Sequence, residues 1–162
     1  MASPVLNYTT KIPASRTIAE CQAMLGQAGA LSVSVTYKNR RPTGLSFRIE
    51  TPFGIRPYAM PVHADGIATL LKKIDEDNAW PPGYYKGGGG RAQIKRFLTP
   101  EHAVDVAWRV AKDWLEAQLA IIDASMVTLE QVMLPYLEVE PGTTVYDRYL
   151  ANERAALEAG HG

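Results

Sequence analysis

The sequence predicts an α+β fold: a single domain in which an antiparallel meander of three to five strands packs against a long helix of the C-terminal half and shorter helices. Residues 31–62 alternate apolar and polar side chains in three runs joined by short polar turns, as sequential antiparallel strands do. Residues 100–124 repeat apolar side chains at helical spacing without an internal breaker. A chain of 162 residues is long enough to bury one core, so we expect one domain over residues 1–162.

The first predicted helix spans residues 17–28. Thr17 can cap its N-terminus, and Glu20 can reach back to the backbone of the cap, as in a capping box. A short lead-in strand over residues 7–12 precedes this helix and ends at Pro13.

Three sequential strands are predicted next. The third contains two prolines, which place it at an edge of the sheet because proline cannot donate to a strand ladder. The outward face of the meander would carry several cations. The strands are residues 31–37, 45–50 and 55–62, with Leu31, Val33, Val35 and Tyr37 on one face of the first. The prolines are Pro57 and Pro61, and the cations are Lys38, Arg40, Arg41, Arg48 and Arg56.

The second half of the chain is predicted to be mainly helical. A helix over residues 64–74 is followed by a connection over about residues 78–98. The next helix has the clearest signals in the chain, because Thr99 can cap it and Pro100 suits its first turn. Its apolar arc is wider than the stripe of a surface helix. Residues 100–124 are therefore either the central packed helix or a contact with a second subunit in a homo-oligomer.

The C-terminal part is predicted with less regularity. A short helix over residues 126–134 stops near Pro135. Residues 143–150 suit either a final strand or the start of a helix that reaches Glu158. The tail over about residues 151–162 is otherwise expected to be disordered.

The net charge of zero hides an asymmetry between two parts of the chain. Residues 1–100 contain 13 Lys and Arg against six Asp and Glu, whereas residues 101–162 contain four against 11. This division indicates either a basic working surface or an attraction between the two parts, within one subunit or between subunits.

The most unusual segment is the glycine-rich stretch at residues 81–91. Its four consecutive glycines, residues 87–90, are costly in a helix or a strand and therefore predict a loop. The loop is either a solvated, disordered segment or a functional one. A functional loop would bind nucleic acid, with tyrosines stacking on bases and cations neutralising phosphates. The candidate residues are Tyr84, Tyr85, Lys86, Arg91, Lys95 and Arg96, with Arg40, Arg41 and Arg48 extending the surface onto the sheet.

The sequence contains no recognisable catalytic or metal-binding constellation. Arg91 follows the glycines where a Walker loop needs a lysine and a hydroxyl residue, and no βαβ unit surrounds them. Cys21 is predicted to be a buried apolar residue, and the three histidines lack the spacing of metal ligands. We therefore expect no enzyme activity, no cofactor and no metal.

Three segments resemble a family of small hypothetical proteins that bacteriophages and other mobile elements often encode. They are LSFRIETPFG at 45–54, AWRVAKDWLEAQL at 107–119 and MLPY at 133–136, and the similarity covers most of residues 7–150. The family has no established activity, so the resemblance implies a phage setting and no site residues. In that setting, small DNA-handling proteins and inhibitors of host defence are both common. The order helix, three-stranded meander, helix also looks like the core of single-strand annealing proteins, which is an analogy of fold.

These observations leave two functions of different classes. The first is a non-enzymatic nucleic-acid-binding protein that handles single-stranded DNA in phage replication or recombination. The second is a phage-encoded inhibitor of host defence that binds a host protein or a nucleotide signal, through the loop or the apolar face of the 100–124 helix. We expect either to act in the cytoplasm of a bacterial host without a membrane partner. No apolar run approaches the about 20 residues that cross a bilayer, and the first residues lack a secretory pattern.

Overall fold

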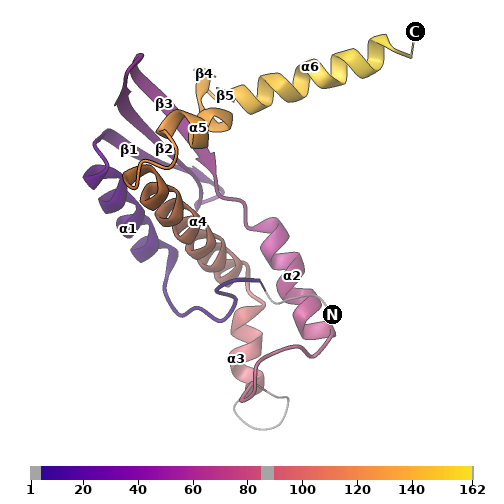
Figure 1. Ribbon diagram of the computed structural model, residues 1–162. Coiled ribbons are helices and arrows are strands. Elements are labelled where there is room, and N and C mark those ends of the chain that lie inside the picture. The colour runs from indigo at the N-terminus through magenta and orange to yellow at the C-terminus, as the bar shows by residue number, and fades with distance from the viewer. Residues whose placement is uncertain (1–4, 85–89, 162) are drawn as a thin grey trace.

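The computed structural model describes residues 5–84 and 90–161, and it confirms the α+β class. A three-stranded and a two-stranded antiparallel sheet combine with six α-helices in these residues, and α4 is the longest helix (Figure 1). In chain order the elements are α1 (Ala14–Gln27), β1 (Ala30–Lys38), β2 (Arg41–Thr51), β3 (Gly54–Pro61), α2 (Asp65–Glu76), α3 (Gly90–Phe97), α4 (Pro100–Asp123), α5 (Leu129–Met133), the 3-10 helix η1 (Leu134–Tyr136), β4 (Glu138–Glu140), β5 (Thr143–Thr144) and α6 (Val145–Ala159).

The larger sheet is the predicted meander, with β2 between β1 and β3. In the β1–β2 turn, Asn39 and Arg40 have φ values of 52° and 63°, as a two-residue turn that matches the twist of its strands requires. β3 lies at the edge, and a single bridge from Tyr58 to Leu137 ties it to the chain before β4. Helices α1 and α4 pack on one face of the sheet (Figure 1), and the other face is largely exposed and carries Arg48.

The N-terminal segment differs from the sequence prediction. Residues 7–12 contain turns in place of the predicted strand, and Asn7 adopts a φ of 64°, in the left-handed region. Helix α1 begins at Ala14, three residues before the predicted cap at Thr17. The side chain of Asp105 in α4 accepts from the Ala14 N–H at 2.8 Å, so a residue distant in sequence satisfies this helix end.

The prediction of one loop over residues 78–98 is wrong in its last part. Helix α3 occupies its last part from Gly90 onwards. Ile94 and Phe97 stand three residues apart on this helix, and both are buried in the core. Burial of these two side chains outweighs the helix-breaking effect of the preceding glycines.

Helix α6 follows the helical alternative for the C-terminal part. The Thr144 side chain accepts from the Asp147 N–H, and the Asp147 carboxylate accepts from the Thr144 N–H, which forms a capping box. The helix runs to Ala159 and so covers most of the tail for which disorder is the other prediction. It projects from the body (Figure 1), and none of its residues is buried.

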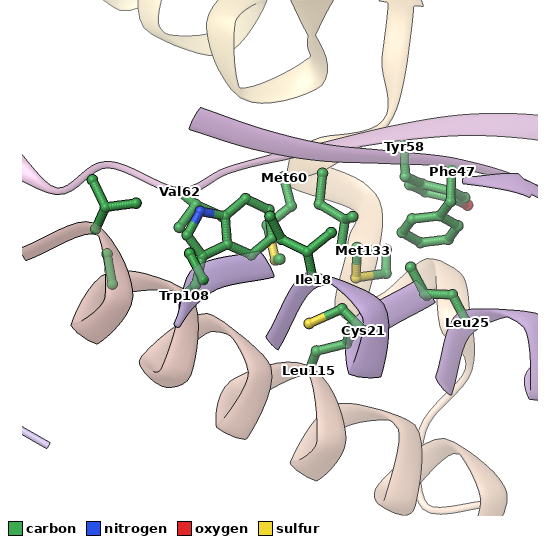
Figure 2. Close-up of a cluster of buried hydrophobic side chains, with 14 of the residues drawn as sticks. Ile18, Cys21, Leu25, Phe47, Tyr58, Met60, Val62, Trp108, Leu115 and Met133 are labelled. Atoms are coloured by element: carbon green, nitrogen blue, oxygen red, sulfur yellow. The ribbon is translucent and has the colours of Figure 1, made fainter. Parts of the chain in front are cut away.

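Two clusters of buried side chains hold the body together. The first lies between the larger sheet, α1, α4 and α5, where Trp108 and Cys21 are fully buried (Figure 2). The second joins α2, α3 and the start of α4 around Trp80 and Phe97, whose ring centroids are 5.5 Å apart. Because α4 contributes to both clusters, its wide apolar arc is used inside the chain, and α4 is the central packed helix. A contact with a second subunit through this helix stays a prediction.

Candidate nucleic-acid interface

The N-terminus of α4 is the place where several of the predicted cations meet. Thr99 caps the helix, since its side chain accepts from the His102 N–H at 3.2 Å, and Pro100 occupies the first turn, as predicted. The first turn of a helix carries the positive end of the helix dipole. In α4 the Ala103 N–H is bonded to the Thr99 carbonyl and Pro100 has no N–H, so the dipole and the nearby cations are what can attract an anion here. The dipole therefore attracts anions to this part of the surface. The carboxylate of Glu101, in the same turn, opposes that attraction.

One cleft flanks the start of α4 on the side of the β1–β2 turn. Its volume is about 320 Å³, and its walls come from that turn, the start of α2 and the first turns of α4. Lys38 and Arg41 line it from the turn, and His63 lines it from the β3–α2 connection. Helix α2 begins at this cleft without a side-chain cap. Two cations and a second helix N-terminus thus meet in one depression, where they favour an anionic group against the Asp65 carboxylate in the first turn of α2.

A second groove flanks the start of α4 on its other side. Its volume is about 270 Å³, and Lys11 and Arg96 line it together with Glu101 and Asp105. Asp105 is engaged in capping α1. We call the cations that line these two depressions the basic rim, which consists of Lys11, Lys38, Arg41 and Arg96. Arg40 is exposed in the β1–β2 turn next to Arg41 and lines neither depression.

Among the described residues, one ion pair involves the basic rim. Arg41 Nη2 lies 3.5 Å from Glu101 Oε1, and both side chains are exposed. Exposed pairs of this kind contribute about 0–1 kcal/mol to stability. Arg41 can therefore exchange the Glu101 carboxylate for a phosphate at little cost.

An exposed aromatic ring stands next to the basic rim in the chain. Tyr37 directly precedes Lys38 and is 62% exposed, although the alternation predicts it on the half-buried face with Val35. The pairing of β1 with β2 shifts between Thr36 and Tyr37, and such an irregularity redirects the side chains that follow it. Leu31, near the shift at the other end of β1, is exposed as well. The alternation runs unbroken through both shifts, so the sequence gives no signal for this exposure.

Two residues of the predicted loop are engaged in the second core cluster. Arg91 Nη1 donates to Asp75 Oδ1 at 3.2 Å, and the same oxygen accepts from Trp80 Nε1 at 3.1 Å. Tyr84 is half-buried and packs on Phe97, with 5.5 Å between the ring centroids. These contacts compete with any contact of Arg91 and Tyr84 to a ligand.

The other predicted residues lie in three places. Lys95 is exposed on α3 beside Arg96 of the basic rim. Arg48 is exposed on the open face of the sheet, seven residues along β2 from the rim and so about 23 Å away. Tyr85 and Lys86 lie outside the described residues. The structure thus brings Arg41 and Arg96 to one region and separates them from Arg48.

Lys11 belongs to the basic rim and was missing from the predicted set. It reaches the groove because the N-terminal segment crosses α4, where His102 Nε2 donates to the Tyr8 carbonyl and Asn7 Nδ2 donates to Asp113, both at 2.7 Å. These contacts join residues 94 and 106 positions apart, so no local pattern could have indicated them.

Ionisable groups with shifted pKa values also lie between α1 and α4. Burial raises the pKa of the Cys21 thiol to about 11, which makes it a poor nucleophile at neutral pH. Arg109 Nη1 donates to Glu20 Oε2 at 2.7 Å and lowers the pKa of that carboxyl. Cys21 packs in the core between α1 and α4, and the ion pair between Glu20 and Arg109 joins the two helices.

Three further findings concern metal sites, membrane spans and similarity to known proteins. Within residues 5–84 and 90–161, no three His, Cys, Asp or Glu side chains are grouped as a metal site needs. In the same part of the chain, no helix has both the length and the apolarity that crossing a bilayer requires. No protein-family model, no curated protein and no solved structure matches the chain, so the resemblance to bacteriophage proteins stays a prediction and a function has to be inferred from the basic rim.

Proposed function

We propose that the protein binds nucleic acid without enzymatic activity and holds single-stranded DNA along the basic rim, in phage replication or recombination. The observation that carries the proposal is the arrangement of cations on both sides of one helix N-terminus. Lys38 and Arg41 line the cleft on one side, and Lys11 and Arg96 line the groove on the other. A phosphate backbone that crosses the start of α4 would meet both pairs of cations and the positive end of the helix dipole between them.

Single strands are favoured over duplexes by the exposed ring of Tyr37. An unpaired base can stack on an exposed aromatic side chain, whereas bases in a duplex are already stacked on each other. Tyr37 lies next to Lys38 and is paired across the strands with Pro42, which lines the same cleft. Consecutive strand residues point to opposite faces, so a base that stacks on this ring would belong to a nucleotide next to the one whose phosphate reaches Lys38.

Fluorescence anisotropy with labelled DNA and RNA, single- and double-stranded, tests the proposal when it is repeated over a range of salt concentrations. We expect single-stranded DNA to bind most tightly, with an affinity that falls linearly on a double-logarithmic salt plot. Arg41→Ala and Arg96→Ala should each weaken binding and reduce the slope by about 0.7, the value for one lost phosphate contact on a single strand. Tyr37→Ala should weaken binding while leaving the slope unchanged.

Control variants distinguish binding at the basic rim from a general effect of removing any exposed positive charge. Arg154→Ala removes an exposed cation from the projecting helix α6 and should leave the affinity unchanged. Arg48→Ala removes the cation on the open face of the sheet, and a change in its nucleic-acid affinity would show that this face also contacts the ligand. Glu101→Gln removes the carboxylate beside Arg41 and should tighten binding. Absent or salt-independent binding, or an equal loss in Arg154→Ala and Arg41→Ala, would contradict the proposal.

A second candidate function is inhibition of a host defence system by binding a host protein. An apolar groove of about 290 Å³ between β3, α2, α4 and η1 favours it, because the half-buried part of the broad apolar face of α4 lines this groove. Trp114 and Tyr136 meet there edge to face, with 5.7 Å between the ring centroids. We expect Val110→Ser to reduce capture of a host protein from lysate and to leave nucleic-acid affinity unchanged. The reverse pattern, with Arg41→Ala as the damaging variant, favours the first function.

A further inference from the structure

Helix α6 carries an apolar stripe that the rest of the described chain leaves exposed. The helix projects from the body (Figure 1), and the exposed fractions of Tyr146, Tyr149 and Leu157 are 53%, 57% and 64%. The rings of Tyr146 and Tyr149 are neighbours, with 6.5 Å between their centroids. Isolated helices shorter than about 12–15 residues are marginal in water, and contiguous exposed apolar patches mark interaction surfaces. A helix of 15 residues with no buried side chain therefore calls for a partner.

The side of α6 that carries Tyr146 and Leu157 also carries the half-buried Leu150 and the acidic Glu153, and the spacing of these four residues is symmetric about their centre. Tyr146, Leu150, Glu153 and Leu157 stand four, three and four residues apart, which puts them on one side of the helix at about 100° per residue. This order of spacings is the same from either end. When two copies of α6 lie antiparallel, Tyr146 of each copy is therefore opposite Leu157 of the other, and Leu150 is opposite Glu153. The pattern fits a second copy of the same helix.

Charges beside the stripe fit the same arrangement. Asp147 and Arg154 are seven residues apart and flank the stripe on the same side. In the antiparallel pair, each of them lies close to its opposite charge on the second copy, so two ion pairs form. The hydrogen bonds from Thr144 reach Asp147 Oδ2, which leaves Oδ1 for a guanidinium. In a parallel pair, the two opposite charges would be about 10 Å apart along the helix axis.

We propose that α6 pairs antiparallel with α6 of a second copy of this chain, about a two-fold axis. Glu153 within the seam costs affinity and fixes the register, as polar residues do in coiled-coil seams. The Tyr149 hydroxyl of the second copy can donate to this carboxylate. Each helix is about 22 Å long, and one such pair buries less than the roughly 1,200 Å² of stable interfaces. The dimer is therefore weak and forms at high protein concentration.

Sedimentation velocity of the full chain over a wide concentration range tests the association. We expect a dimer whose fraction rises with concentration. Leu157→Ser removes two apolar contacts per dimer and should lower the association constant about tenfold or more. Arg154→Asp places like charges beside each other and should also weaken the dimer. Ala155→Ser, on the opposite side of α6, is the matched control and should leave association unchanged.

Disulfide trapping tests the orientation. Tyr146→Cys and Leu157→Cys are prepared separately, mixed and oxidised; Cys21 is buried and does not interfere. An antiparallel pair gives the mixed disulfide, because positions 146 and 157 of different copies face each other. Disulfides between like variants only, a monomer at every concentration, a dimer that survives Leu157→Ser, or a contact of α6 solely with a different protein would each overturn the proposal. Equal unfolding transitions of variants and parent establish that the body remains folded.

Discussion

Helices α4 and α6 begin in the same way and lie in opposite environments. Each starts after a threonine whose side chain accepts from a backbone N–H of the first turn. Seven residues of α4 are buried and the helix joins two core clusters, whereas α6 has no buried residue. The cap therefore sets where each helix begins, and the apolar arc behind the cap decides how much the helix contributes to the stability of the body.

The largest effect that this comparison predicts is the loss of Trp108. Its side chain is fully buried on α4, and its Nε1 donates to the Pro42 carbonyl at 3.1 Å. Trp108→Ala should lower the free energy of unfolding by about 3–5 kcal/mol, since it leaves a large cavity and removes the hydrogen bond to the Pro42 carbonyl. Denaturant unfolding followed by circular dichroism measures this loss. Trp114→Ala, on the same helix but half-buried, is the control and should cost less.

The ion pair between α1 and α4 should make the stability of the body depend on pH. The hydrogen bond from Arg109 lowers the pKa of Glu20 in the folded protein, so the carboxylate stabilises the fold above its unfolded pKa. That contribution is lost as the pH falls through the lowered folded pKa. Glu20→Gln should therefore reduce the free energy of unfolding near pH 7, and its difference from the parent should shrink in acid.

Urea unfolding at a series of pH values measures this difference. Glu50→Gln is a suitable control, because Glu50 is exposed and forms no ion pair among the described residues. A difference between parent and Glu20→Gln that is the same at every pH would mean that the charge of Glu20 does not stabilise the fold.

The sequence predicts the regular elements well and the tertiary contacts poorly. Alternation and capping signals locate the meander and α4, including Thr99 as its cap. The start of α1 depends on Asp105, and the position of Lys11 depends on contacts across α4; neither leaves a local pattern. The sequence does not predict helix α3, because consecutive glycines indicate a loop more strongly than two apolar residues, Ile94 and Phe97, indicate a helix.

The candidate interface was predictable in part for the same reason. Arg41 and Arg96 could be named from composition, since cations next to turns and loops are common at phosphate-binding surfaces. Their meeting around the start of α4 needed the fold. The exposure of Tyr37 needed the irregular pairing of β1, which alternation alone does not show. Residue types are visible in a sequence, whereas their convergence depends on contacts between distant segments.

Removal of the two threonine caps compares α4 and α6 directly. Thr99→Ala should lower the free energy of global unfolding by about 1 kcal/mol, because α4 unfolds only with the body. Thr144→Ala should reduce the hydrogen-exchange protection of α6 and leave global unfolding nearly unchanged, because α6 can fray independently. Hydrogen exchange by mass spectrometry and denaturant unfolding of both variants give the two quantities. Equal effects on global unfolding would show that α6 is coupled to the core.

The smallest expected effect on the body is the removal of residues 151–162. All of the described residues in this segment are exposed, and the part of α6 that follows β5 and packs on η1 is retained. The free energy of unfolding should therefore change by no more than about 0.5 kcal/mol, the usual range for surface changes. Nucleic-acid affinity should also be unchanged, because the basic rim lies at the start of α4. The shortened chain lacks Glu153, Arg154 and Leu157, so it should lose the weak dimer. Loss of body stability together with the dimer would instead mean that the second half of α6 packs on its own chain.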